Sequence, residues 1–233
     1  MQRAAVLNNA EWCDIVCRSH GLSTRFDGDA WTSAARTPPC YPDAVTLVPN
    51  VSAGDLLARI DGSVGCSIKD SFASLDVSAE GFRVLFDAEW IVRTGEMPVP
   101  EPAGPGWEPV RDKREFAQWK HLWSGDGGPT EVLRDELLAH DAVVVVAARD
   151  GERIVAGAAL NRSEHVVGIS NFFAPDDTAA ASWLGLLSFA TARFPGFALV
   201  GYESGDQLAV ALESGFEIAG PLRVWIRDEA LDP

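Results

Sequence analysis

The stretch "NFFAPDDTAAASWLGLLSFA", residues 171–190, decides the fold. Its aromatic start is strand-like, Pro175 is typical of a turn, and the alanines and leucines that follow are typical of a helix. A strand that leads through a turn to an exposed helix start is a common way to hold a phosphate. Asp176 and Asp177 nevertheless place two negative charges in this turn. The stretch therefore predicts a strand–turn–helix unit that either binds a phosphorylated cofactor or only has the shape for it.

The composition indicates a globular chain of one large domain or two small ones. The 233 residues are 47% hydrophobic and 23% charged, with a formal net charge of −15. Such a charge repels nucleic acid and anionic membranes, so small molecules, basic ligands or proteins are the expected partners. The longest apolar run, 142–148, is too short to span a bilayer, and residues 1–12 do not resemble a signal peptide. We therefore expect a cytoplasmic protein.

Cys13, Cys17 and His20 have the spacing of one helix face. They are either part of a metal site or buried thiols beside a hydrophobic helix face. A fourth ligand at a recognisable spacing is missing, so we expect buried thiols and no metal.

A proline- and glycine-rich stretch, "RTGEMPVPEPAGPGW" at 93–107, reads as an extended linker. It divides the chain into an N-terminal half, 1–94, a linker, 95–106, and a C-terminal half, 107–233.

The residue patterns predict an α/β (α+β) fold with a mixed, mostly antiparallel sheet flanked by helices. In the N-terminal half they predict a helix that Asn8 caps and Gly21 ends, and a short helix over 29–36. A strand over 43–49, a helix over 52–60 and strands over 65–71 and 82–92 follow. In the C-terminal half we expect strands at 107–110, 142–149, 153–161, 165–174, 197–204 and 221–227, and helices from 112, over 131–140, after Pro175 and over 206–214.

The two halves share a pattern near their ends. Gly81-Phe82 and Gly215-Phe216 each follow a helix-like segment, and each precedes a strand that ends in Trp-Ile and an arginine. The similarity predicts a tandem repeat whose first copy is shortened.

The element order of 107–230 resembles that of the GNAT superfamily of acyl-CoA-dependent N-acetyltransferases. In that family an aromatic strand end and "x-Pro" lead into a glycine-containing loop that opens a helix. Backbone amides of this loop hold the pyrophosphate of coenzyme A. Phe173 and Pro175 match the strand end. The resemblance implies acetyl-CoA, or another acyl-CoA, as cofactor, bound by a set of residues that begins on the strand and continues into the helix: Phe172, Phe173, Thr178, Ala179, Ala181 and Ser182.

The loop departs from the family pattern in three places. Thr178 stands where an Arg or Gln is usual, Ala181 replaces the first glycine, and Trp183 stands in place of the final Gly or Ala. A competing interpretation is that Asp176, Asp177 or Thr178 caps the helix and occupies the amides that a phosphate would use.

The resemblance also implies a catalytic acid four residues before Gly-Phe, where this chain has Ala211. Tyr202 is the candidate acid, or else an amphipathic residue at the edge of the core, and Glu203 is the candidate base or amine anchor. We expect strand alternation to bring only one of the two to the site. Asn171, beside Ser170 on the preceding strand, is the third candidate catalytic residue, or else a residue that satisfies local backbone. Asn161 is expected in a turn.

Two functions follow from these residues. The first is an N-acyltransferase that transfers an acetyl or other acyl group from CoA to an amine of a small molecule or a protein. The second is a catalytically inactive module of GNAT shape that binds a ligand or a protein.

Overall fold

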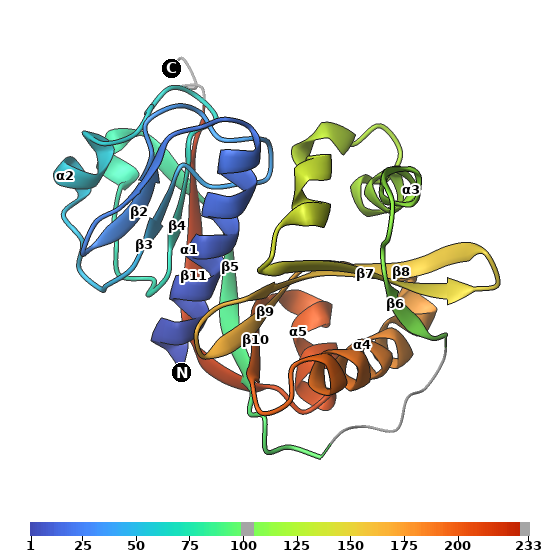
Figure 1. Cartoon of the computed structure of the whole chain (residues 1–233). Coiled ribbons are helices and arrows are strands. Elements are labelled where there is room, and N and C mark those ends of the chain that lie inside the picture. The colour runs from blue at the N-terminus through green and yellow to red at the C-terminus, as the bar shows by residue number, and fades with distance from the viewer. Residues whose placement is uncertain (99–104, 229–233) are drawn as a thin grey trace.

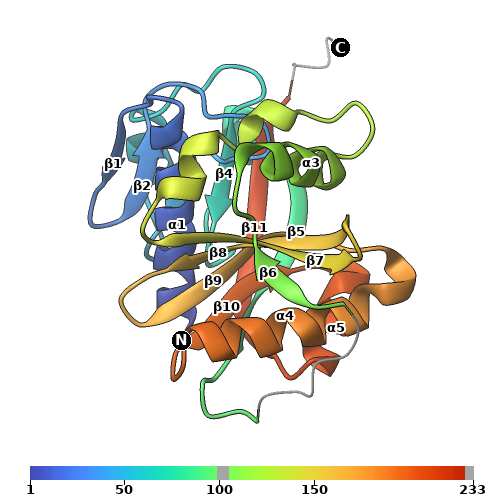
Figure 2. The ribbon, with the colours of Figure 1, turned by 45° about the vertical axis from the view of Figure 1, so that its right-hand side comes forward.

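The computed structural model describes residues 1–98 and 105–228, and within them eleven strands form one sheet (Figures 1 and 2). The strand order is β1-β2-β3-β4-β11-β5-β10-β9-β8-β7-β6. Much of the predicted linker, 99–104, lies outside the described residues, and the division into two halves stays a prediction.

The first part of the chain contributes five strands, two α-helices and one 3-10 helix. Their bounds are α1 Gln2–Ser19, β1 Thr24–Phe26, β2 Ala30–Ser33, β3 Ala44–Thr46, α2 Ala53–Leu57, β4 Ser67–Asp70, the 3-10 helix η1 Ser78–Glu80, and β5 Phe82–Arg93.

The second part contributes six strands, three α-helices and three 3-10 helices. Their bounds are β6 Trp107–Pro109, α3 Lys113–Ser124, η2 Thr130–Val132, η3 Asp135–Ala139, β7 Val143–Asp150, β8 Arg153–Arg162, β9 Val166–Phe173, η4 Asp176–Thr178, α4 Ala179–Arg193, β10 Ala198–Glu203, α5 Gly205–Glu213 and β11 Glu217–Arg227.

The sheet is mixed and mostly antiparallel, as predicted. Of the strand pairs in the described residues, β3–β4 and β9–β10 are parallel and the others are antiparallel. Strand β5 lies between β10 and β11, so strands from the two parts of the chain alternate in the middle of the sheet.

Helices cover both faces of the sheet (Figure 1). On one face α1 and α3 pack on the strands, with Trp12 and Trp119 in a shared core. On the opposite face α4 and α5 lie over β7 to β10, with Trp183 and Leu186 in the core. Within the described residues no helix is both long and apolar enough to cross a membrane.

Three predicted elements were wrong in detail. Helix α1 begins at Gln2, so Asn8 lies inside it rather than at its start, although Gly21, with φ 75°, does follow its end. Residues 29–36 contain strand β2 instead of a helix, because Trp31 is buried against the core and tertiary packing overrides local propensity. Residues 131–140 form two 3-10 helices rather than one α-helix.

Asn8 and Asn161 join α1 to the sheet through reciprocal hydrogen bonds. The Asn8 amide donates to the Asn161 carbonyl oxygen at 2.9 Å, and the Asn161 amide donates to the Asn8 carbonyl oxygen at 3.0 Å. Asn161 is therefore a buried residue of β8 and not the turn residue that the sequence suggests. Gly168 of β9 pairs with Asn161, and a Cβ atom on it would overlap the Asn8 side chain. This glycine makes the close approach of α1 possible.

Replacing either asparagine with alanine is expected to destabilise the protein by roughly 1–3 kcal/mol, because the remaining partner keeps a buried polar group without its bond. The double variant Asn8→Ala/Asn161→Ala should lose about the sum of the single losses, because each side chain donates to a main-chain carbonyl oxygen that both substitutions leave in place. Urea unfolding of the four proteins measures these losses. No loss in either single variant would show that the two bonds do not stabilise the contact between α1 and β8.

Candidate functional site

The parallel strands β9 and β10 separate after a short paired segment. Ala198, Leu199 and Val200 pair with Val166, Val167 and Gly168, and no pair follows between the two strands. From residue 169 onward the edge of β9 that faces β10 has no strand partner among the described residues. The backbone amides and carbonyls of this edge are therefore open to a ligand.

A β-bulge at Asn171 changes the direction of the side chains that follow it. Asn171 has a φ of 54°, and the pairing of β8 with β9 shifts between Gly157/Phe173 and Ala159/Ser170. As a result Phe172 stacks on Trp183 of α4, at 4.6 Å between ring centroids, whereas Phe173 packs on Trp119 of α3 at 5.1 Å. Of these two predicted cofactor contacts, only Phe172 lines the opening between the strands.

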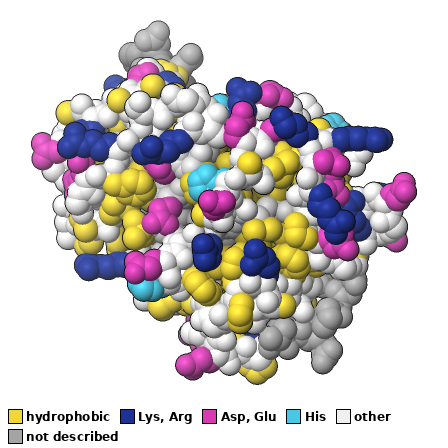
Figure 3. Space-filling view, viewed as in Figure 1, with side chains coloured by type: hydrophobic (Ala, Val, Ile, Leu, Met, Phe, Trp, Pro, Cys, Tyr) yellow, Lys and Arg dark blue, Asp and Glu magenta, His cyan; other side chains and the backbone are white. Residues whose placement is uncertain are grey.

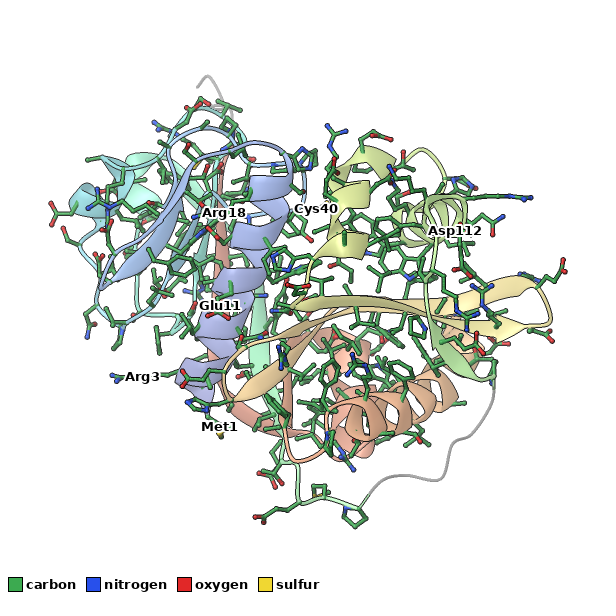
Figure 4. All side chains as sticks on the ribbon, viewed as in Figure 1. Met1, Arg3, Glu11, Arg18, Cys40 and Asp112 are labelled. Atoms are coloured by element: carbon green, nitrogen blue, oxygen red, sulfur yellow. The ribbon has the colours of Figure 1, made fainter. Side chains whose placement is uncertain are left out.

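The opening between β9 and β10 contains a pocket of about 280 Å³. Its walls come from both parts of the chain, and Cys40, labelled in Figure 4, lies beside α1 at this pocket. The lining residues are Asn9, Trp12, Cys13, Cys40, Tyr41, Pro42, Lys69, Trp123, Ile169, Ser170, Asn171, Phe172, Tyr202 and Glu203.

Both Tyr202 and Glu203 line this pocket, contrary to the expectation that only one of them reaches it. Tyr202 packs on Trp90 and lies in the core beneath α1. Glu203, the next residue along the strand, points to the other face. Because β9 and β10 have separated, the pocket extends through the sheet and reaches side chains on both faces.

Glu203 is the carboxylate of this pocket. Burial raises the pKa of Glu203 to about 7. Among the described residues it has no hydrogen-bond or ion-pair partner that would hold it in the charged form. At neutral pH this carboxyl group is therefore divided between its protonated and ionised forms, as suits a general base.

Tyr41 and Lys69 are pocket residues that the sequence analysis missed. The buried Tyr41 hydroxyl donates to Asn171 Oδ1 at 3.3 Å, and burial raises the pKa of Tyr41 well above its ordinary value. Lys69 Nζ lies 4.3 Å from the centre of the Tyr202 ring. The chain has two tyrosines, and both line this pocket.

The start of helix α4 has no side-chain cap. Thr178 occupies the N-cap position, but its hydroxyl donates to the Pro175 carbonyl oxygen at 3.2 Å and accepts no amide. The capping interpretation of Asp176, Asp177 and Thr178 was therefore wrong. Asp176 and Asp177 are exposed at this helix start. The Thr178 and Ala179 amides donate to the Pro175 and Asp176 carbonyl oxygens, so η4 continues into α4. Among the described residues, the amides open to an anion are therefore those at the start of η4, beside the two carboxylates.

Trp183 does not lie at the mouth of the pocket. It is 1% exposed and its ring sits between Phe172 and Phe216, the latter 5.5 Å away in an edge-on contact. The indole therefore belongs to the core beneath α4. Ala179 and Ser182 of the same helix are buried as well, and the four predicted cofactor residues of this segment, Thr178, Ala179, Ala181 and Ser182, lie outside the pocket lining.

The structure places His20 in different surroundings from Cys13 and Cys17. Both cysteines are buried in the core beneath α1, and burial raises the pKa of each thiol. The His20 ring instead contacts the Val132 carbonyl oxygen at 2.8 Å. In the part of the chain that the structure describes, no cluster of three metal-binding side chains is found.

This arrangement, a mostly antiparallel sheet in which two parallel strands separate around a pocket and a helix starts just after the first of them, is similar to that of solved GCN5-related N-acetyltransferases. No protein-family model matches the sequence, and no curated protein is similar to it. The resemblance comes from solved structures and concerns the fold.

A GCN5-related N-acetyltransferase from Kribbella flavida is similar over 97% of this chain and 96% of its own, with a TM-score of 0.67 and 16% identity. A GCN5-related N-acetyltransferase-like protein from Streptococcus suis has a TM-score of 0.55 and 14% identity, over 97% of this chain and 98% of its own. A GCN5-related N-acetyltransferase from Sphaerobacter thermophilus is similar over 88% of this chain and 79% of its own, with a TM-score of 0.56 and 10% identity. The chain thus has the GNAT fold over almost its whole length.

The position of Trp183 gives a stability prediction. Trp183→Ala is expected to lower the free energy of unfolding by roughly 3–5 kcal/mol, because it leaves a cavity between Phe172 and Phe216. That loss should lower Tm by roughly 6–20 °C, and Trp183→Phe should lower it less. Differential scanning calorimetry of both variants is the test. A normal Tm for Trp183→Ala, with stronger coenzyme A binding, would instead show that the indole blocks the cofactor.

Proposed function

We propose that this protein is an N-acyltransferase that transfers an acetyl or other acyl group from an acyl-CoA to an amine. The observation that carries the proposal is the position of Glu203, an isolated carboxyl group with a pKa near 7 in the opening between β9 and β10. A general base is most useful when its pKa lies near the working pH.

Two features of the chain fit an acyl-CoA. The unpaired edge of β9 offers backbone partners for the amides of the pantetheine arm. The uncapped start of η4, which leads into α4, offers amides for the pyrophosphate, although the carboxylates of Asp176 and Asp177 weaken this site. An acyl-CoA bound there supplies an acyl thioester, whose C–S bond breaks as the C–N bond to the amine forms.

The residues of the pocket then have distinct roles. Glu203 accepts the proton that the amine loses. Tyr202 donates a proton to the departing thiolate, and Asn171, held by Tyr41, orients the reacting groups at the bulge of β9. The amine proton goes to Glu203 and the proton for the thiol comes from Tyr202. Exchange with solvent then removes the proton from Glu203 and returns one to Tyr202 before the next turnover.

Acetyl-CoA is expected to stabilise the protein. At an acetyl-CoA concentration a hundred times its Kd, the free energy of unfolding increases by about 2.7 kcal/mol, which appears as an increase in Tm of several degrees. Changing Asp176 and Asp177 together to asparagine should increase the shift at the same acetyl-CoA concentration, because two repulsive charges are removed. Asp126→Asn, in the exposed loop after α3, is the matched control and should leave the shift unchanged. Thermal unfolding at millimolar acetyl-CoA measures this. No shift in any of these proteins would favour a catalytically inactive module.

The acyl transfer should depend on pH through Glu203. With a pKa of about 7, the carboxylate form of Glu203 that accepts a proton is lost as the pH falls below 7. When kcat/KM is calculated for the neutral form of the amine, it should therefore decrease below pH 7 and level off above about pH 8. Glu203→Gln should lower kcat by about a hundredfold or more and remove this dependence. Glu89, its partner on β5, lies outside the pocket, and Glu89→Gln is the control. An unchanged pH profile in Glu203→Gln would exclude Glu203 as the base.

A further inference from the structure

Lys69 is a buried cation in the wall of the pocket. Its side chain is on β4, only 5% of the residue is exposed, and Nζ donates to Asn9 Oδ1 at 2.7 Å. The ring of Tyr202 covers another side of the ammonium group. An ammonium group has three N–H donors, and Asn9 uses one of them. The side of the ammonium group that faces neither Asn9 nor the Tyr202 ring is available to a ligand in the pocket.

The other lysines of the chain differ from Lys69 in one respect. Lys120 is also buried, at 8% exposed, but it pairs with Asp135 at 3.2 Å, and Lys113 reaches the same carboxylate at 3.6 Å. Lys69 has no carboxylate within ion-pair distance among the described residues. Burying a charge without a countercharge is costly, and such a cost is commonly kept where a ligand supplies the missing charge.

The position of Lys69 indicates which reactant carries that charge. Tyr202, beneath the ammonium group, lies in the core under α1, whereas the helix start suited to the CoA pyrophosphate belongs to α4 on the opposite face. Lys69 therefore borders the side of the opening away from α4. Since Glu203 also lines the pocket, one small molecule in it meets a cation and a proton acceptor.

We propose that Lys69 binds a carboxylate of the acceptor, and that the acceptor is a small amine that also bears a carboxylate, such as an amino acid. This proposal rests on the acyltransferase function and specifies its substrate class. A pocket of about 280 Å³ has the size for such a molecule, close to the lower end of the volumes of small-molecule sites.

The test measures binding without acyl-CoA. The purified protein is titrated by calorimetry with the common amino acids and with the C-terminal amide of each, in which a neutral amide of similar size replaces the carboxylate. At least one amino acid is expected to bind roughly ten- to a hundredfold more tightly than its amide, as expected for a charge-assisted hydrogen bond. Lys69→Met should abolish this preference, Lys69→Arg should keep part of it, and the buried control Lys120→Met should keep all of it.

Three results would overturn the proposal. They are equal binding of acids and amides, a preference that survives in Lys69→Met, and no binding of any amino acid. The variants are compared by circular dichroism and Tm, so that a folding defect is distinguished from a lost contact. The proposed function is judged separately by the acetyl-CoA shift and the pH profile, which do not require an amino acid.

A carboxylate on the acyl group is the alternative source of the same charge. Succinyl-CoA and acetyl-CoA are therefore compared with a simple amine as acceptor. A preference for succinyl-CoA that disappears in Lys69→Met would place the carboxylate on the acyl group and overturn the proposal. Equal use of both acyl donors, together with the amino-acid preference above, would support it.

Discussion

The separation of β9 and β10 after Gly168 is the constraint on which the rest of the structure depends. Gly168 is the last residue of β9 that pairs with β10, and its missing side chain admits the Asn8 amide of α1. The N-terminal helix is thus fixed at the point where the strands part. Beyond it, the edge of β9 has no strand partner, and the space becomes a pocket that reaches both faces of the sheet. The bulge at Asn171 then directs Phe172 and Phe173 to opposite helices.

The N-terminal part of the chain completes this pocket. Helix α1, the loop with Cys40 and Tyr41, and strand β4 with Lys69 all contribute to its wall. Strand β4 is held there because it pairs with β11, the last strand among the described residues, which in turn pairs with β5. A fragment that lacked the N-terminal residues would therefore lack the cation of the pocket and the hydroxyl that holds Asn171. The similarity between the segments around Gly81 and Gly215 stays a prediction about origin, but the two strands that follow these glycines lie side by side.

The sequence predicted the fold class and most strands, because hydrophobic patterns and turn residues are local signals. It failed at 29–36, where a buried tryptophan outweighs the helical preference of its neighbours, and at Asn8, whose role depends on a partner 153 positions away. The same limit applies to the site. Asn171, Tyr202 and Glu203 lie on the strands that the family resemblance points to, and the structure places them in one pocket. Tyr41 and Lys69 reach that pocket through strand pairings that local patterns do not show. The only sequence signal for Tyr41 is its place among the prolines of "TPPCYPD".

The net charge of the whole chain and the charged groups of the pocket lead to different expectations about the acceptor. The net charge of −15 favours the approach of cationic amines. On the face shown in Figure 3, however, basic and acidic side chains are interspersed, so that face has no continuous field of one sign. Within the pocket, Glu203 and Lys69 are ionisable groups without ionic partners among the described residues. Because the surroundings of a buried group are less polar than water, the electrostatic interaction of each group with a ligand is stronger there. Long-range attraction by the whole chain influences how fast a cation arrives, whereas in the proposed acyltransferase these two groups select the amine. An acceptor selected by both therefore carries a positive and a negative group, with its amine close to Glu203 and its anion beside Lys69.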